Sequence, residues 1–293
     1  MSDCAFDRIV LIFNPNSTGD APRLAEELRA DLAERLPDVP VRMSPTEHAG
    51  HARALAQDAA GEGGRPLIVS VSGDGGYNEV VDGVMRSGND KAVCAVKAAG
   101  NANDHRRVTA ERPLVEAIVD GETRRIDLLR LTIGDEPVRY AHSYIGIGLT
   151  PVVAIDLENG GKGSFREIVS VVRTFAKFRP FTIELEDGTR RSFDSLLFAN
   201  IAEMAKYATL SEDGAPDDGR FEVITLPHTA KWRILGVAIK AATRGLGPQP
   251  TAKHYAFTTA KPMPAQLDGE LVTLDAGTPV RVDIAPRALE TVG

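Results

Sequence analysis

Apolar and polar positions follow two different periods in the first 125 residues. Short apolar runs at 8–15, 39–46, 66–71 and 91–98 are typical of buried β-strands. Between and after these runs, apolar residues return every three or four positions, which predicts helices at 20–36, 49–60, 77–84 and 113–121. Strands that alternate with helices predict a mostly parallel sheet with helices on both of its faces.

After about residue 125 the strand period dominates. We expect strands within 125–134, 138–148, 180–201, 219–226, 254–260, 265–274 and 279–285, and helices only at 164–178 and 230–243. Turn dipeptides such as Asp187-Gly188 and Asp268-Gly269 favour antiparallel hairpins. The sequence therefore predicts an α/β domain over 1–125 and a β-rich domain over 126–285, with a cleft between them as the default ligand site.

Composition and charge narrow the class of protein. The 293 residues are 43% hydrophobic and 26% charged, as in ordinary globular proteins, and the net charge of −7 argues against a nucleic-acid partner. Two cysteines, Cys4 and Cys94, build neither a disulfide framework nor a four-ligand zinc site. No signal peptide and no apolar window of roughly 18 to 20 residues is present, so we expect a cytoplasmic protein.

Three loops of the first half share one design, in which a strand ends in small and polar residues just before a helix. They are NPNSTG (14–19), SGDGG (72–76) and AAGNAND (98–104). Such loops gather at the carboxyl ends of parallel strands, and their N–H groups suit a polyphosphate. A tight strand-to-helix turn is the alternative for 72–76 alone. No Walker loop and no G-x-G-x-x-G follows a strand, so a Walker-type NTPase and a dinucleotide-binding dehydrogenase are poorly supported.

These motifs resemble those of the diacylglycerol kinase catalytic family, the lipid kinases that include sphingosine kinases. NPNSTG looks like the family's Asn-Pro-x-Ser-Gly element, SGDGGYNEVVDGV like its Gly-Gly-Asp-Gly-Thr-x-x-Glu-Val loop, and GNANDHRR like its Gly-Thr-x-Asn-Asp-Phe-Ala-Arg element. Later stretches also match in family order, namely SPTEHAGHARALA, IGIGLTPVVA, APDDGRFEVI and QLDGE. The resemblance covers nearly the whole chain.

The resemblance implies a fold and a set of site residues. The first domain would be a Rossmann-like, NAD-kinase-like parallel α/β domain that residues 286–293 rejoin, and the second an antiparallel β-sandwich that binds the lipid. ATP would contact these residues: Asn14, Asn16, Ser17, Thr46, Gly73, Asp74, Gly75, Gly76, Asn78, Glu79, Gly100, Asn101, Asn103 and Asp104.

Four acidic positions would carry the chemistry. Asp74 would hold the Mg²⁺ that accompanies ATP, and Glu270 would be the general base, with Asp268 beside it to orient it. Asp218 would hold a structural Mg²⁺ together with backbone oxygens of Ala215 and Arg220. From the residues alone, Asp74 is equally a helix cap, Glu270 a hairpin glutamate that faces water, and Asp218 part of a surface turn.

The chain departs from the family pattern at four places. Gly76 stands where the family has Thr, which removes a hydroxyl near the phosphates. Asn101 replaces a Thr and His105 replaces a Phe, and both change the shape of the pocket. Thr150-Pro151 stands where an Asp-Ala is usual. We expect the nucleotide site to survive these changes, whereas catalytic efficiency, nucleotide preference and above all acceptor identity are left open.

The first hypothesis for function is an ATP- and Mg²⁺-dependent kinase that phosphorylates a hydroxyl of a diacylglycerol- or sphingoid-type lipid at a membrane surface. Basic patches at 177–181 and 240–247 suit such contact, although ordinary charged helix faces explain them as well. Two alternatives stay open, a kinase of a soluble metabolite such as NAD and a non-catalytic relative that binds nucleotide or lipid. Which lipid is used, and whether the chain forms a homodimer, are left open by the sequence.

Overall fold

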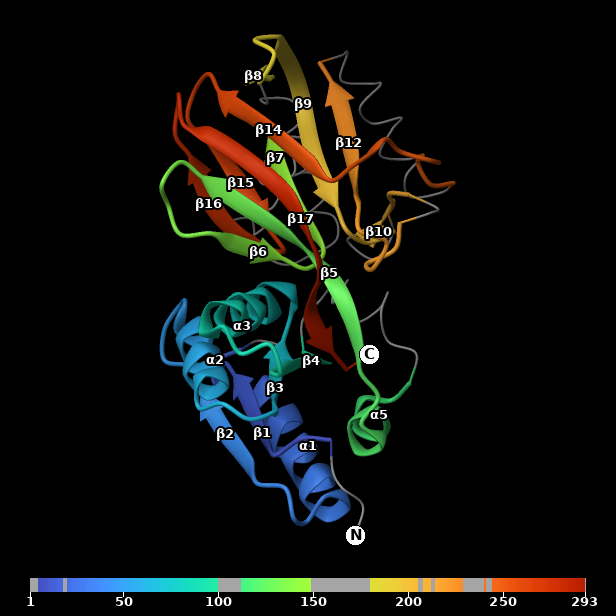
Figure 1. The fold of residues 1–293 in the computed structure, drawn as a ribbon. Coiled ribbons are helices and arrows are strands. Elements are labelled where there is room, and N and C mark those ends of the chain that lie inside the picture. The colour runs from blue at the N-terminus through green and yellow to red at the C-terminus, as the bar shows by residue number, and fades with distance from the viewer. Residues whose placement is uncertain are drawn as a thin grey trace. The chain divides into compact units, whose positions relative to one another are not determined.

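The structure is a computed structural model that describes residues 5–17, 20–99, 112–148, 180–204, 208–211, 214–228, 240 and 244–292. The chain divides into two compact units, the first made of residues 1–128 and 286–293 and the second of residues 129–285 (Figure 1). The chain passes between the two units within strand β5 (Arg124–Ile133) and again within strand β17 (Pro279–Thr291). Each unit is described by itself below.

The first unit is built on a parallel sheet. Its strands lie in the order β2 (Val41–Pro45), β1 (Arg8–Phe13), β3 (Pro66–Ser72), β4 (Val93–Ala98) and the last residues of β17. All four neighbouring pairs are parallel. The predicted parallel α/β architecture of the first part of the chain is therefore confirmed.

Helices cover both faces of this sheet. Helices α1 (Ala21–Arg35) and α5 (Leu114–Asp120) share one hydrophobic cluster with Leu67, Val69 and Val71 of β3. Side chains alternate along a strand, so the intervening positions face the other layer, where α2 (His51–Gly61) and α3 (Asp74–Ser87) lie side by side (Figure 1). Each face of the sheet is thus buried under a pair of helices, as the alternating pattern predicted.

The contact between α2 and α3 is unusually close at Gly83. A Cβ atom on Gly83 would lie 2.2 Å from the backbone oxygen of Arg53, so only a glycine allows this approach. At Asp82, the residue before Gly83, the buried carboxylate accepts a 2.7 Å hydrogen bond from Arg53 Nε. Close packing and a buried ion pair together fix the position of α3, the helix that starts at the SGDGG loop.

The second unit is β-rich, and its strand pairs in the described part of the chain are all antiparallel. The main path runs β16 (Glu270–Leu274), β15 (Met263–Leu267), β7 (Tyr144–Gly148), β9 (Arg190–Ala199), β8 (Phe181–Leu185), β14 (His254–Thr259) and β17. Strands β6 (Arg139–Ala141) and β12 (Phe221–Pro227) pair beside this path, and short β10 (Glu203–Met204), β11 (Ala208–Thr209) and β13 (Thr251–Ala252) complete the set. The predicted β-rich fold of the second part is confirmed.

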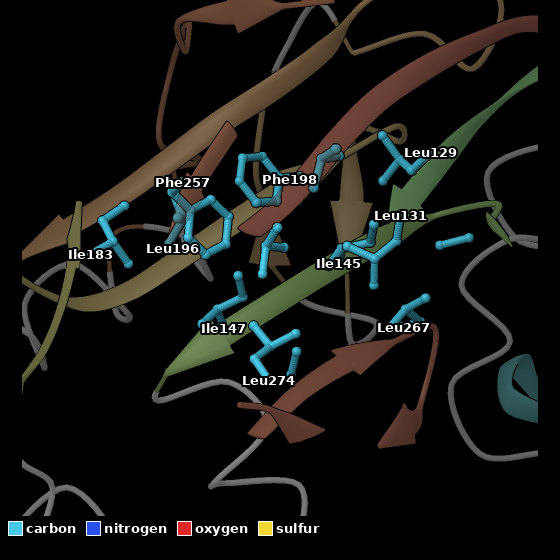
Figure 2. Packing of buried hydrophobic residues seen from close by; sticks show 14 of the residues in the cluster. Leu129, Leu131, Ile145, Ile147, Ile183, Leu196, Phe198, Phe257, Leu267 and Leu274 are labelled. Atoms are coloured by element: carbon cyan, nitrogen blue, oxygen red, sulfur yellow. The ribbon is translucent and has the colours of Figure 1, made fainter. Parts of the chain in front are cut away.

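One hydrophobic cluster forms the core of the second unit. Figure 2 shows side chains from many strands converging on it, among them Leu131, Ile145, Phe198 and Phe257. The rings of Phe198 and Phe221 meet edge to face, with their centroids 5.7 Å apart and their planes at 90°. Because the core joins strands from every part of the unit, it gives the hairpins at its edges a rigid support.

Two further predictions concern helices. Those expected at 164–178 and 230–243 lie outside the described residues, Lys240 excepted. None of the helices in the described part of the chain combines the length and the apolar character needed to cross a membrane.

Candidate functional site

The carboxyl ends of the central strands in the first unit are level with one another. Phe13 at the end of β1 pairs with Val71 of β3, and Ser72 pairs with Ala98 at the end of β4. The N–H of Thr46 donates a 2.8 Å hydrogen bond to the carbonyl oxygen of Phe13, which brings the segment after β2 to the same edge. The sheet therefore collects the loops that follow β1, β2, β3 and β4 at one edge, where parallel sheets bind ligands.

The first of these loops is a compact turn that starts α1. Asn14 Oδ1 accepts a 2.9 Å hydrogen bond from the N–H of Asn16, and the carbonyl of Asn14 accepts one of 3.2 Å from the N–H of Ser17. The hydroxyl of Ser17 accepts a 3.2 Å bond from the N–H of Ala21, the first residue of α1. Asn14 and Asn16 are exposed at the sheet edge, whereas Ser17 serves the helix start.

The second loop turns directly from β3 into α3. Gly73 is the N-cap residue, in an extended conformation with φ −88° and ψ −171°, and Asp74 is the first residue of the helix. Gly73, Gly75 and Gly76 bring no side chains to this turn, and Asp74 is half-buried. The main-chain N–H groups and the positive end of the helix dipole therefore make the start of α3 suitable for a phosphate.

Of the next three residues of α3, two are buried and the third is hydrogen-bonded to another segment of the first unit. Tyr77 is buried, and its hydroxyl lies 3.2 Å from Oγ1 of Thr291 on β17. Asn78 is only 1% exposed. Glu79 Oε1 accepts a 3.2 Å hydrogen bond from the N–H of Gly50, so it holds the segment that carries Thr46. Of the predicted ATP contacts, Asn78 is thus buried, and Glu79 is hydrogen-bonded to the segment that follows β2.

The third loop is described only at its start. The N–H of Ala99 donates a 2.9 Å hydrogen bond to the carbonyl of Ser72, which ties this loop to the SGDGG loop. The remaining predicted contacts, Gly100, Asn101, Asn103 and Asp104, lie outside the described residues. Asn101 is also a departure from the family pattern, and two other departures, His105 and Thr150-Pro151, lie outside the described residues as well.

In the second unit, Asp268 lies at the turn between β15 and β16. Asp268 and Gly269 both have positive φ angles, 46° and 98°, as a two-residue type I′ hairpin requires. Asp268 is fully buried, and its carboxylate accepts hydrogen bonds from three successive N–H groups, those of His142 (2.6 Å), Ser143 (3.1 Å) and Tyr144 (2.8 Å). The carboxylate therefore fastens the hairpin to the start of β7.

Glu270 follows this turn as the first residue of β16. Its carboxylate is about a quarter exposed, and Arg139 Nη2 donates a 2.9 Å hydrogen bond to Glu270 Oε1. The arginine precedes it by 131 residues, and no motif of the sequence pointed to it. The ion pair restricts the glutamate to one orientation while it keeps part of the carboxylate accessible.

Asp218 occupies a different kind of turn. Its Oδ1 accepts a 2.8 Å hydrogen bond from the N–H of Arg220, and Gly219 between them has φ 73°. Asp218 is exposed. The oxygen donors of the predicted metal site are one carboxylate and the carbonyls of Ala215 and Arg220, a set that suits a hard cation such as Mg²⁺. Within the described ranges, however, no group of three or more His, Cys, Asp or Glu side chains is placed to hold a metal ion.

Comparisons with known proteins agree with the motifs. Residues 8–131 match the family model of the diacylglycerol kinase catalytic domain. The diacylglycerol kinase of Staphylococcus saprophyticus is 25% identical over 266 residues, which cover 85% of this chain and 82% of that protein.

Solved structures share the fold. A diacylglycerol kinase from Bacillus anthracis superposes with a TM-score of 0.72 at 18% identity, over 98% of this chain and 97% of that one. Yeast NADH kinase in complex with NADH gives a TM-score of 0.53 at 14% identity, over 98% and 83% of the two chains. The family model over residues 8–131 and the curated relative therefore support the resemblance to the diacylglycerol kinase catalytic family, and with it a lipid kinase, which is a phosphotransferase.

Proposed function

We propose that the protein is an ATP- and Mg²⁺-dependent kinase that phosphorylates a hydroxyl of a diacylglycerol- or sphingoid-type lipid. The observation that carries this proposal is the start of α3 in a chain that resembles this family. There a helix begins at the level ends of parallel strands, with a glycine as N-cap and Asp74 as its first residue. This arrangement offers main-chain N–H groups to a phosphate and a carboxylate beside it.

Phosphoryl transfer depends on positioning and on charge stabilisation. We assign the binding of the ATP phosphates to the edge formed by Asn14, Asn16, Thr46 and residues 73–76. Asp74 would hold the Mg²⁺ of the nucleotide, and bound Mg²⁺ would neutralise charge on the phosphate oxygens. Asp218, with the carbonyls of Ala215 and Arg220, is the proposed structural metal site.

Glu270 is the proposed general base. Its carboxylate would accept the proton of the lipid hydroxyl while that oxygen forms a bond to the γ-phosphorus, and the bond from the γ-phosphorus to the β–γ bridging oxygen breaks to release ADP. Arg139 holds the carboxylate in place, at 2.9 Å. Asp268 is buried and bound by three N–H groups, which supports a positioning role for it under Glu270.

A labelling experiment tests the activity. The purified protein is incubated with γ-labelled ATP, Mg²⁺ and either mixed micelles of diacylglycerol or sphingosine, or NAD in solution. We expect label in the organic phase. Label in aqueous NADP would instead establish a kinase of a soluble metabolite, and ATP binding without any transfer would establish a non-catalytic relative.

Glu270→Gln tests the base. We expect kcat to fall by about 10²- to 10⁴-fold with the affinity for ATP unchanged, because the amide cannot accept the proton. Glu184→Gln is a matched control, since Glu184 is also on a strand of the second unit and also paired with an arginine, Arg190 at 2.8 Å. Undiminished transfer by the Glu270 variant would disprove the assignment.

Two further properties concern membrane association and the oligomeric state. A lipid substrate places the reaction at a membrane surface, so we propose that the protein associates peripherally with it. Sedimentation with lipid vesicles should show this association, and recovery of all the protein in the supernatant at low salt would contradict it. A homodimer stays a prediction, which sedimentation equilibrium would decide.

A further inference from the structure

Besides the four departures from the family pattern described above, the SGDGG loop contains a fifth, Ser72, which lies next to Gly76. In SGDGG, Ser72 stands at the first glycine of the motif Gly-Gly-Asp-Gly-Thr, and Gly76 stands at its threonine. A Cβ atom on Gly76 would lie 2.6 Å from Ser72 Oγ and 2.7 Å from Ser72 Cβ. Side-chain Cβ atoms essentially never approach other heavy atoms closer than 3.0 Å. The Ser72 side chain therefore occupies the volume that any side chain at position 76 would need.

The Ser72 hydroxyl holds the helix start from the strand side. It donates a 2.9 Å hydrogen bond to the carbonyl oxygen of Gly73, the N-cap residue of α3. Its only proton is used there, so the 2.7 Å contact between the Oγ atoms of Ser70 and Ser72 has Ser70 as donor. Ser70 is only 1% exposed, which gives the hydroxyl pair a rigid base in β3.

We propose that Ser72 and Gly76 are a matched pair, in which Ser72 takes over the hydroxyl-bearing position of the loop and acts as a positioning residue for the phosphates of ATP. This inference rests on the proposed function and deepens it. With Gly73, Gly75 and Gly76 free of side chains, a phosphate reaches the N–H groups of the first helical turn directly. The Ser72 hydroxyl keeps the Gly73 peptide, and with it this turn, in the binding orientation.

A double-mutant cycle between Ser72→Gly and Gly76→Thr tests the pairing through the melting temperature. Gly76→Thr alone should lower the melting temperature, because its side chain collides with Ser72. The double variant, in which the colliding Ser72 side chain is gone, should melt close to the wild-type temperature. Additive effects, or a wild-type melting temperature for Gly76→Thr alone, would overturn the matched pair.

Ser72→Ala separates the effect of the Ser72 hydroxyl group from the effect of the side-chain volume. The variant keeps the Cβ atom and loses the hydrogen bond to Gly73, so the dissociation constant for ATP, measured by calorimetry, should rise about tenfold, the equivalent of one net hydrogen bond. In transfer assays KM for ATP should rise while kcat changes little, and Ser72→Thr should restore the affinity. Wild-type affinity of Ser72→Ala would overturn the positioning role.

The outcomes also separate this inference from the proposed function. If wild-type protein binds no ATP, both the proposed function and the ATP role of Ser72 are wrong, while the melting temperatures still decide whether the two positions are coupled. If the wild type binds ATP and Ser72→Ala binds it equally well, the proposed function stands and the inference alone fails.

Discussion

The dipeptide Asp-Gly occurs at three places that the family resemblance marks as functional, and two of them, one in each unit, use it in opposite ways. In the first unit, Asp74-Gly75 begins a helix, and Asp74 is half-buried. In the second unit, Asp268-Gly269 forms a hairpin turn in which both residues have positive φ angles, and Asp268 is completely buried. The first turn is thus shaped by main chain and glycine, whereas the second is shaped by a carboxylate.

This difference indicates different roles for the two aspartates, ligand binding for Asp74 and structural support for Asp268. A carboxylate that accepts three main-chain hydrogen bonds in the interior is committed to the structure. A half-buried carboxylate at the start of a helix stands where an anion and its cation would bind. The comparison is therefore consistent with the proposed roles, in which Asp74 serves the nucleotide and Asp268 positions Glu270.

The largest expected effect comes from removing the two carboxylates in turn. Asp268→Ala should lower the free energy of unfolding by about 3 to 5 kcal/mol, because it strands three N–H groups that are bonded to the buried carboxylate. Asp74→Ala should cost less than about 1 kcal/mol, since the residue lies half-buried at a helix end, while it abolishes phosphoryl transfer. Urea unfolding and the transfer assay measure the two effects.

Asp268→Asn is the milder companion variant, in case Asp268→Ala does not fold. It keeps one oxygen acceptor and should lose about 1 to 3 kcal/mol, with faster hydrogen exchange at the amides of residues 142–144. The structural role of Asp268 would be disproved if the Asp268 variants were as stable as wild type, or if Asp74→Ala were the less stable of the two alanine variants.

The second prediction isolates the backbone of the hairpin turn from its carboxylate. Gly269 has φ 98°, so Gly269→Ala should cost about 1 to 2 kcal/mol through strain. Gly61, the last residue of α2, is a control, because no atom lies within 4 Å of a Cβ placed there and its φ is not in the left-handed region. Gly61→Ala should leave stability unchanged or raise it by up to about 1 kcal/mol. Equal unfolding free energies of the two variants would refute the strained turn.

The folds of the two units could be predicted from the sequence because the apolar periods of helices and strands involve residues that are close together in the chain. The stripe of α1 is an example: Ala21, Ala25, Leu28 and Leu32, which share one helical face in the sequence, are all buried. The Asp187-Gly188 and Asp268-Gly269 turns were likewise predictable as hairpins, since the chain pairs β8 with β9 and β15 with β16 across them.

The environment of the site residues could not be predicted in the same way. Asp187 is exposed and Asp268 is buried, although both precede a glycine in a hairpin. The difference arises because the N–H partners of Asp268 come from residues 142–144, some 124 to 126 positions earlier. The Arg139 partner of Glu270 is equally distant in sequence. By contrast, Ser72 and Gly76 are only four residues apart and both depart from the motif Gly-Gly-Asp-Gly-Thr, so their pairing was visible in the sequence, although only Gly76 was identified there as a departure.

The last and smallest effect compares the two units through acidic residues of the strand that they share, β17. Glu290, in the first unit, and Asp283, in the second, both have a lowered pKa. Burial alone would raise the pKa of Glu290, but hydrogen bonds from Arg65 and Thr123 and the charge of Arg125 outweigh it. For Asp283, hydrogen bonds from Arg281 and His254 outweigh the effect of burial.

A carboxyl whose pKa is lower in the folded state stabilises the fold above its unfolded pKa, about 4.3 for Glu, and this contribution disappears as the pH falls through the folded value. Glu290→Gln should therefore cost about 1 kcal/mol at pH 7 and progressively less as the pH falls below about 4.3. Asp283→Asn should follow the same trend with a smaller effect, because its partners Arg281 and His254 are largely exposed. Denaturant unfolding at both pH values measures each difference. A penalty for Glu290→Gln that did not shrink at all between pH 7 and pH 3 would show that Glu290 supports the first unit through packing and not through its charge.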